Sequence, residues 1–365
     1  MTALDLVEVR RERLPLTQPY TIARETFVDV ELFFVRLRAG GEVGTGSASP
    51  APEVTGETPD GCEQALFEMA EELTGSDSEG IEGVATLSDH CAERWPAAPA
   101  ARAAVDMALW DLLGKRRGVP VVDLLGRAHA ALPTSVTLGI QSQEDALAAA
   151  SEHVGRGFRA LKIKLGRDVD EDIERLCRLR EAVGPRVALR TDPNAGYDAE
   201  SLRRYLEGTR SLSIEFCEQP IERGRDGEIL AATTGLDATP PFAADESLHG
   251  LADLDALDLQ PYAIWNLKLM KCGGITPARA LSDRAGERGI DLMWGCNDES
   301  RVSIAAALHV AFSSPATRYL DLDGSFDLAR DLAAGGFALE AGCLRPAPGP
   351  GLGIVWEEGA RGAGE

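Results

Sequence analysis

The first 125 residues show a pattern of strands followed by helices. Two segments alternate apolar and polar residues as strands do, LDLVEVRRERL and ELFFVRLRAGGEVGTGSASP. Two later segments, CEQALFEMAEEL and AARAAVDMALWDLLGKRRG, repeat apolar residues every three or four positions, which predicts amphipathic helices. Strands that precede helices without alternating with them indicate an α+β module over residues 1–125.

From about residue 130 the pattern changes, because short apolar runs now alternate with amphipathic helices. The runs are SVTLGI, ALKIKLG, VALRTDPNAG, SIEFCEQP, PFAADES, AIWNLKLM, DLMWGC and RYLDLDG. One position near the end of each later run can be compared with the next: 164, 192, 218, 245, 268, 295 and 321. Their spacing is close to the length of one β/α unit of a barrel, roughly 30 residues. Eight strands joined by helices predict a parallel barrel over residues 126–330, with the tail 331–365 folded back on the first module.

Composition and charge narrow the range of partners. The chain has 365 residues and a net charge of −22, so its field repels nucleic acids and anionic membranes. It has no run of about eighteen apolar residues, so no membrane span is expected. The seven cysteines are scattered and never form a C-x-x-C pair, which favours reduced thiols in the cytoplasm over disulfides or a zinc site.

Three carboxylates, Asp192, Glu218 and Asp245, end three consecutive predicted strands. Adjacent strands of a sheet lie about 4.8 Å apart, so these side chains can converge on one point. Three unpaired negative charges at a barrel mouth are unfavourable, and a divalent cation would neutralise them. An all-oxygen set without His or Cys favours Mg²⁺ over zinc, and Asn194 lies where it could support the site.

Lysines flank these carboxylates on both sides. Lys162 and Lys164 share one face of the strand before the first carboxylate, and Lys268 ends the strand after the last, so they face each other across the mouth. When a proton leaves the carbon next to a carboxylate, a metal can stabilise the resulting enediolate. Burial and a nearby cation lower the pKa of a lysine, so that it can act as the base near neutral pH. Two facing bases favour inversion, as in a racemase or epimerase. Lys271 is out of phase with Lys268 and is expected to reach solvent at the rim.

Five ordered motifs resemble a known family. They are K-x-K at 162–164, D-x-N at 192–194, E-Q-P at 218–220, A-D-E-S at 244–247 and K-L-M-K-x-G-G at 268–274. With the segment AVDMALWDLLGK, they make nearly the whole chain similar to the enolase superfamily, in its muconate-lactonizing subgroup. The resemblance implies an α/β fold, a modified TIM barrel of the form (β/α)7β, with an α+β capping domain over residues 1–125 and the tail.

The resemblance also implies site roles. Asp192, Glu218 and Asp245 would hold one Mg²⁺ per subunit. Lys164 and Lys268 would be the acid/base pair, and Lys162 would bind substrate beside them. The implied reaction is a 1,1-proton transfer through an enediolate.

The end of the last run indicates the kind of substrate. Asp321 and Asp323 lie on one face of YLDLDG, and two carboxylates aimed at one place favour a cation. In superfamily members that epimerise dipeptides, such a D-x-D pair holds the substrate's α-ammonium group. Arg24 lies where similar enzymes pair an arginine with a glutamate side chain, which favours an L-Ala-L-Glu dipeptide inverted at its C-terminal residue. Asn297 and Asp298 would line the same pocket, where an acid instead suits a cationic or polar side chain.

Several alternatives stay open at this point. The same scaffold would suit a muconate cycloisomerase, an o-succinylbenzoate synthase, an N-acyl amino acid racemase, or an epimerase of cationic or apolar dipeptides. A metal-dependent binding protein belongs to a different class, and the facing lysines disfavour it. We expect a small-molecule dipeptide substrate and assembly into a homo-oligomer, with neither nucleic acid nor membrane as a partner.

Overall fold

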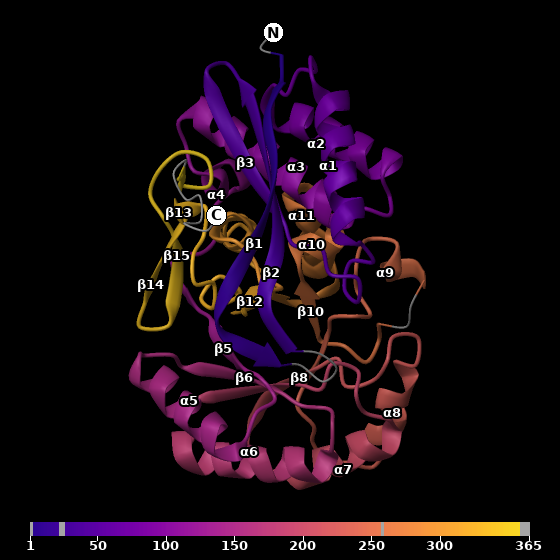
Figure 1. The fold of residues 1–365 in the computed structure, drawn as a ribbon. Helices are drawn as coiled ribbons and strands as arrows, with labels where there is room; N and C mark the ends of the chain where they lie inside the picture. Colours follow the sequence, from indigo (N-terminus) through magenta and orange to yellow (C-terminus); the bar gives the residue numbers. More distant parts are fainter. Residues whose placement is uncertain (1–2, 22–25, 257–258, 358–365) are drawn as a thin grey trace.

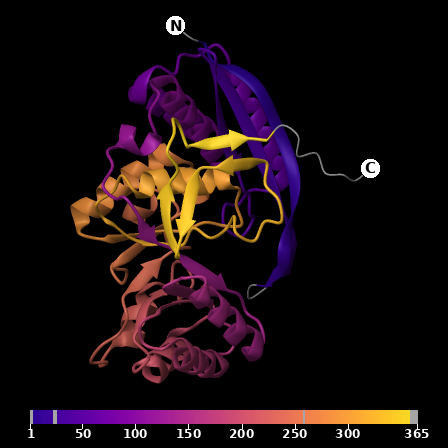
Figure 2. The same cartoon turned by 90° about the vertical axis from the view of Figure 1, so that its left-hand side faces the viewer.

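The computed structural model describes residues 3–21, 26–256 and 259–357, and it begins with a three-stranded antiparallel meander. Its strands are β1 (Asp5–Thr21), β2 (Thr26–Ala39) and β3 (Glu42–Ala48). Four helices follow: α1 (Pro59–Leu73), α2 (Gly80–Arg94), α3 (Pro99–Arg117) and the short α4 (Val121–Leu125). The long β1–β2 hairpin runs from this domain down across the barrel (Figures 1 and 2).

Strand β3 lies directly against helix α3 because two of its residues have no side chain. A Cβ atom at Gly44 would lie 2.0 Å from the carbonyl oxygen of Ala108, and one at Gly46 would lie 1.8 Å from that of Ala104. The small side chains of the alanines on α3 let the strand backbone pack close to the helix backbone. Since α3 also contacts α10 and α11 of the barrel, it joins the meander to the catalytic half of the chain.

The barrel has eight parallel strands, in the same order in space as in sequence. They are β5 (Ser135–Leu138), β6 (Ala160–Lys164), β7 (Ala188–Asp192), β8 (Ile214–Glu218), β9 (Phe242–Ala244), β10 (Ile264–Leu267), β11 (Asp291–Trp294) and β12 (Thr317–Leu320). A bridge between Thr134 and Leu320 brings the first strand beside the last, so the sheet is nearly closed. The predicted modified TIM barrel with a capping domain is therefore confirmed.

Helices connect the strands and surround the barrel (Figure 1). They are α5 (Gln143–Gly155), α6 (Val169–Val183), α7 (Ala199–Thr209), α8 (Gly227–Thr233), α9 (Asp253–Ala256), α10 (Leu269–Cys272), α11 (Ile275–Arg288) and α12 (Arg301–Ala311). In the described part of the chain, no helix is both long and apolar enough to cross a membrane.

A small apolar cluster fills the floor of the barrel and is separate from the main core. Its buried members are Phe216, Ala243, Ile264 and Met293, with Tyr319 packed against them. The guanidinium of Arg190 lies 5.4 Å from the centre of the Phe216 ring and 5.2 Å from that of Tyr319. Because residues two apart on a strand share a face, the side chains two positions further along each strand point into the mouth.

The C-terminal segment forms small sheets that contact both halves of the chain. Strand β13 (Ala333–Gly335) pairs with β16 (Ile354–Trp356), and β14 (Phe337–Glu340) with β15 (Cys343–Pro346), which pairs with β4 (Leu132–Pro133). The amide of Leu352 donates to Oδ1 of Asp111 on α3 at 2.8 Å, and the ring of Trp356 lies 5.3 Å from that of Phe34. The same segment also contacts barrel helix α12.

The close approach of β3 to α3 can be tested by adding one methyl group. Gly46→Ala places its Cβ against the backbone of Ala104, and such overpacking costs about 1–3 kcal/mol, so the free energy of unfolding should fall by at least this much. Gly286→Ala on α11 is the matched control, because its Cβ meets nothing within 4 Å and should leave stability unchanged or raise it. Urea unfolding measures both variants, and equal stability of the two would contradict the packing described.

Candidate active site

The carboxyl-terminal ends of the strands form the mouth of the barrel, where the charged residues of the sequence motifs gather. Strands β6, β7 and β8 end on such residues, and further ones directly follow β9 and β10. Glu218 and Asp245 lie on the inward face because each is two positions after a residue of the barrel floor, Phe216 or Ala243. The contacts described below place the other charged side chains beside them. In chain order these residues are Lys162, Lys164, Asp192, Glu218, Asp245 and Lys268.

Lys162 is the centre of this group. Its ammonium nitrogen lies 3.0 Å from Oδ2 of Asp192, 2.8 Å from Oε2 of Glu218 and 2.9 Å from Oδ2 of Asp321. Burial disfavours its charge, but these carboxylates outweigh burial and hold the pKa of Lys162 well above the ordinary lysine value. Since Lys162 is only 2% exposed, removing one partner would leave the others without adequate compensation.

Lys164 and Lys268 lie on opposite sides of the mouth. Three strands separate β6 from β10 in the nearly closed eight-stranded sheet, so the ends of β6 and β10 lie across from one another. Lys164 Nζ donates to Asp192 Oδ2 at 2.6 Å, and Lys268 Nζ donates to Asp245 Oδ2 at 2.8 Å. Burial lowers the pKa of Lys268, but the neighbouring Asp245 outweighs burial and raises this pKa above the ordinary lysine value.

Lys271 is buried, and the prediction that it reaches solvent at the rim is wrong. It is 5% exposed and donates to Oδ1 of Asp245 at 2.5 Å, to the backbone oxygen of Asp245 at 2.6 Å and to that of Asn266 at 3.2 Å. The alternation of a strand no longer applies there, because the chain turns into the one-turn helix α10 directly after Lys268. Burial alone would raise the pKa of Asp245, but Lys268 and Lys271 hold it well below the usual value.

Asp192, Glu218 and Asp245 come from three neighbouring strands and offer only oxygen atoms, the ligands that Mg²⁺ prefers. As placed, no three acidic, His or Cys side chains among the described residues lie close enough to share an ion, and Lys162 bridges Asp192 and Glu218 instead. Oε2 of Glu218 is buried, and its contact with the Lys162 ammonium nitrogen at 2.8 Å does not have the geometry of a hydrogen bond. Burial and Asp192 raise the pKa of Glu218 to about 8, which reflects a shortage of positive charge. The residues present therefore fit a divalent cation.

Asp321 and Asp323 directly follow β12, and their surroundings differ. Asp321 accepts from Ser135 Oγ at 2.5 Å and pairs with Lys162, which outweighs burial and lowers the pKa of Asp321. Asp323 accepts the backbone N–H of Thr137 at 2.7 Å and has no basic partner among the described residues. Burial and the neighbouring Asp321 raise the pKa of Asp323 to about 7. A cation bound beside Asp323 would therefore be stabilised.

The loop after β11 lies at the seam between the two domains and carries Asn297 and Asp298. Ser49, just after β3, donates its hydroxyl to the backbone oxygen of Asp298 at 2.8 Å. Burial and then Asp327 raise the pKa of Asp298 to about 6, and this carboxylate has no basic partner in the part of the chain that the structure describes. Arg24, predicted to line the same pocket, lies outside the described residues.

Sequence reasoning missed two amides that hold the carboxylates from behind. Asn266 donates its Nδ2 to Oε1 of Glu218 at 2.7 Å, and Oε1 of Gln219 accepts the backbone N–H groups of Asp245 and Ser247, both at 3.0 Å. A signal for Asn266 was present, because it lies two residues before Lys268 as the only polar residue of an apolar strand. For Gln219 the role depends on contacts across strands, which the sequence does not reveal.

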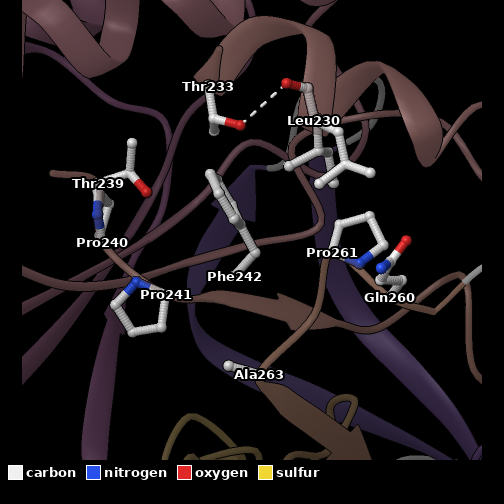
Figure 3. Close-up of a pocket in the computed structure, with 10 residues that line it drawn as sticks. Leu230, Thr233, Thr239, Pro240, Pro241, Phe242, Gln260, Pro261 and Ala263 are labelled. Carbon is white, nitrogen blue, oxygen red and sulfur yellow. Dashed lines mark hydrogen bonds between the residues drawn. The ribbon is translucent and has the colours of Figure 1, made fainter. Parts of the chain in front are cut away.

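A separate surface pocket of about 370 Å³ lies at the other end of the barrel (Figure 3). Phe242, which begins β9, and Ala263, which precedes β10, line it together with Leu230 and Thr233 of α8. Strands β9 and β10 start at this pocket and end at the mouth. Its lining carries no ionisable side chain, so it does not belong to the charged site.

Two protein-family models match the chain. Residues 5–126 match the N-terminal domain of mandelate racemase / muconate lactonizing enzyme, and residues 145–360 match the enolase C-terminal domain-like family. The chain belongs to the enolase superfamily. The resemblance predicted from the five motifs is thereby confirmed.

Relatives of this superfamily member match it over nearly its whole length. An L-Lys-D/L-Arg epimerase of Methylococcus capsulatus is 51% identical over 356 residues, covering 96% of this chain and 99% of that protein. A crystal structure of dipeptide epimerase from Methylococcus capsulatus, complexed with Mg and the dipeptide L-Arg-D-Lys, has a TM-score of 0.91 at 51% identity and covers 98% of this chain and 100% of the other. The substrate-liganded L-Ala-D/L-Glu epimerase of Bacillus subtilis has a TM-score of 0.91 at 31% identity, with 98% and 99% covered. The chain is an isomerase of the epimerase and racemase type.

Replacing Lys162 tests whether its ammonium group holds the carboxylates together. Lys162→Met removes the shared partner of three buried acids, and losing one partner of a buried ion pair costs about 3–5 kcal/mol. We expect the unfolding temperature in EDTA to fall by at least about 5 °C and to recover partly in MgCl₂. Circular dichroism melts of both proteins in each buffer measure this. A loss of the same size in both buffers would contradict the expectation.

Proposed function

We propose that this protein is a dipeptide epimerase that inverts the α-carbon of the C-terminal residue in dipeptides of lysine and arginine. The placement of Lys164 and Lys268 carries the reaction type, since their strands lie across the mouth from each other. With a base on each face of a planar intermediate, a proton can leave from one side and return on the other, which inverts the centre. An elimination or a one-way isomerisation would require only one base.

The substrate's charged ends have partners in the mouth. Its α-ammonium group would bind Asp323, which lacks a basic partner among the described residues, and Asp321 beside it. The α-carbon of the C-terminal residue, next to the substrate's carboxylate, would then lie between the two facing lysines. Lys162, whose ammonium nitrogen is at the centre of the acids, would contact that carboxylate.

Asp192, Glu218 and Asp245 would hold one Mg²⁺ per subunit. When bound, the ion supplies positive charge that stabilises the negative charge developing on the substrate's carboxylate oxygens. The presence of Mg in the Methylococcus capsulatus structure, at 51% identity, supports this assignment. Asn266 and Gln219 would keep the protein ligands in place from behind.

The proton transfer balances within one turnover. One lysine, as a neutral amine, takes the α-proton, and the electron pair of the C–H bond passes into the enediolate. The opposite lysine, as an ammonium, then donates a proton to the other face of the same carbon, and the electron pair forms the new C–H bond. The two lysines have exchanged protonation states at the end, and proton exchange with solvent restores them.

The charge of the substrate's side chains is inferred from Asp298 and from the relatives. Asp298 and the nearby Asp327 have no ion pair with the described residues and would repel a glutamate side chain, while they would attract an ammonium or guanidinium group. Identity of 51% with an L-Lys-D/L-Arg epimerase, against 31% with an L-Ala-D/L-Glu epimerase, supports the cationic alternative over the L-Ala-L-Glu substrate predicted first. The role of Arg24, the homo-oligomer and the cytoplasmic location stay predictions.

Deuterium exchange tests the reaction and the substrate class together. In D₂O with MgCl₂, we expect L-Lys-L-Arg and L-Arg-L-Lys to gain one deuterium at the C-terminal α-carbon and to epimerise, at least about tenfold faster than L-Ala-L-Glu. N-succinyl-L-arginine serves as the matched acyl substrate, because it lacks the α-ammonium group that Asp323 would bind. Mass spectrometry and proton NMR follow the exchange. Faster exchange of L-Ala-L-Glu or of the succinyl compound would contradict the proposed substrate.

Asp298 can be tested separately from the chemistry. Asp298→Asn keeps the size of the side chain and removes its charge, so the loss of a charge-assisted contact of about 1.5–3 kcal/mol should lower kcat/KM for L-Lys-L-Arg by roughly 10- to 100-fold, chiefly through KM. A neutral dipeptide such as L-Leu-L-Leu is the control and should be affected much less. An equal effect on both substrates would exclude Asp298 as the residue that selects cationic side chains.

A further inference from the structure

The two lysines that hold Asp245 differ in how many bonds they make. Lys271 donates to three acceptors: one carboxylate oxygen of Asp245 and the backbone oxygens of Asp245 and Asn266. An ammonium group has three N–H donors, so all of those of Lys271 are used within the protein. Lys268 donates, among the described residues, only to the other carboxylate oxygen of Asp245. Lys268 can therefore turn toward a substrate, whereas Lys271 cannot without breaking three bonds.

The backbone holds Lys271 in this position. Lys268 caps the one-turn helix α10, and the amide of Lys271 donates to the carbonyl oxygen of Lys268 at 3.0 Å. Gly273 and Gly274 then leave the helix with φ of 97° and 120°, which only glycine adopts readily. A Cβ atom at Gly274 would lie 2.5 Å from Oδ2 of Asp106 on α3. The turn that carries both lysines is thus wedged between the barrel and the capping domain.

The two oxygens of Asp245 are divided between the two lysines. Oδ1 faces Lys271 at 2.5 Å, and Oδ2 faces Lys268 at 2.8 Å. If Asp245 gives Oδ2 to a metal ion, Lys271 still holds Oδ1 and neutralises the carboxylate. Without Lys271, Lys268 would be the only ammonium group among the described residues in contact with this buried acid and would stay paired with it.

We propose that Lys271 is a positioning residue that holds Asp245 through Oδ1, leaving Oδ2 for the metal and releasing Lys268 to serve one face of the α-carbon. The proposal rests on the proposed function for the role of Lys268. Loss of Lys271 should impair proton transfer on the face that Lys268 serves more than on the face that Lys164 serves. A residue needed only for folding would impair both faces equally.

The chain offers a matched control for this experiment. Lys115 on α3 also holds a buried acid and a backbone oxygen, because it donates to Oδ2 of Asp111 at 2.7 Å and to the carbonyl oxygen of Val43 at 2.8 Å. It lies in the capping domain, outside the mouth. Lys115→Met therefore reproduces the loss of a buried lysine–aspartate pair without touching the site.

The first readout is the exchange of α-protons from the L,L and L,D diastereomers of Lys-Arg in D₂O at saturating MgCl₂. Lys268→Ala identifies the diastereomer whose proton faces Lys268, as the one whose exchange it abolishes. In Lys271→Met, exchange of that diastereomer should fall at least about tenfold more than exchange of the other, whereas Lys115→Met should slow both equally or not at all. Equal slowing of both diastereomers in Lys271→Met would overturn the proposal.

The second readout is Mg²⁺ affinity, measured by isothermal titration calorimetry without substrate. A carboxylate ligand that has lost its partner typically binds metal 10- to 100-fold more weakly, so Lys271→Met should weaken Mg²⁺ binding by about that factor and Lys115→Met should not. If the wild type exchanges the α-proton of no dipeptide, the proposed function fails, but this measurement still tests the role of Lys271. Unchanged Mg²⁺ affinity in Lys271→Met would overturn the proposal. Lys271→Gln, which keeps N–H donors without charge, replaces Lys271→Met if the latter does not fold, and the same outcomes apply.

Discussion

The barrel mouth depends on the pairing of four buried carboxylates with four ammonium groups. The acids are Asp192, Glu218, Asp245 and Asp321, and the bases are Lys162, Lys164, Lys268 and Lys271. Each charge would be costly alone at this depth, so removal of any one leaves its partners unfavourably buried. The pairing is tightest at Asp245, which two lysines hold, and weakest at Glu218, whose Oε2 contacts the Lys162 ammonium group without the geometry of a hydrogen bond. A divalent cation held by these acids would take over part of the positive charge that Lys162 supplies to Asp192 and Glu218.

The rest of the fold delivers these charges to one place. Short parallel strands with two-residue alternation point their last inward-facing side chains into the mouth, above a floor of apolar residues. Glycines on β3 let α3 approach the meander, and α3 in turn holds the turn that carries Lys268 and Lys271. The contact between Ser49 and the backbone of Asp298 joins the capping domain to the loop proposed to select the substrate.

Much of this arrangement could be predicted from the sequence, because period-two alternation and barrel spacing are local signals. They located Lys164, Asp192 and Glu218 at strand ends. Lys271 was misplaced because a one-turn helix interrupts the alternation after Lys268, and neither spacing nor composition reveals such a turn. The sequence first favoured a glutamate side chain in the substrate. The cationic side chain proposed instead rests on loops from two domains and on Asp327 lying near Asp298, which sequence spacing does not reveal. The hydrogen bond between Gln219 and the backbone of Asp245 on the next strand could not be predicted from the sequence either.

We expect the acids of the mouth to exchange part of their ammonium partners for a metal ion. The most direct test is a crystal structure with Mn²⁺ in place of Mg²⁺, in which anomalous scattering locates the ion. The account predicts one peak per chain, within about 2.0–2.3 Å of oxygens from Asp192, Glu218 and Asp245, with Lys162 withdrawn from at least one of its acids and Lys271 still on Oδ1 of Asp245. A structure with all four ammonium groups in their present places and no peak among the three acids would contradict it.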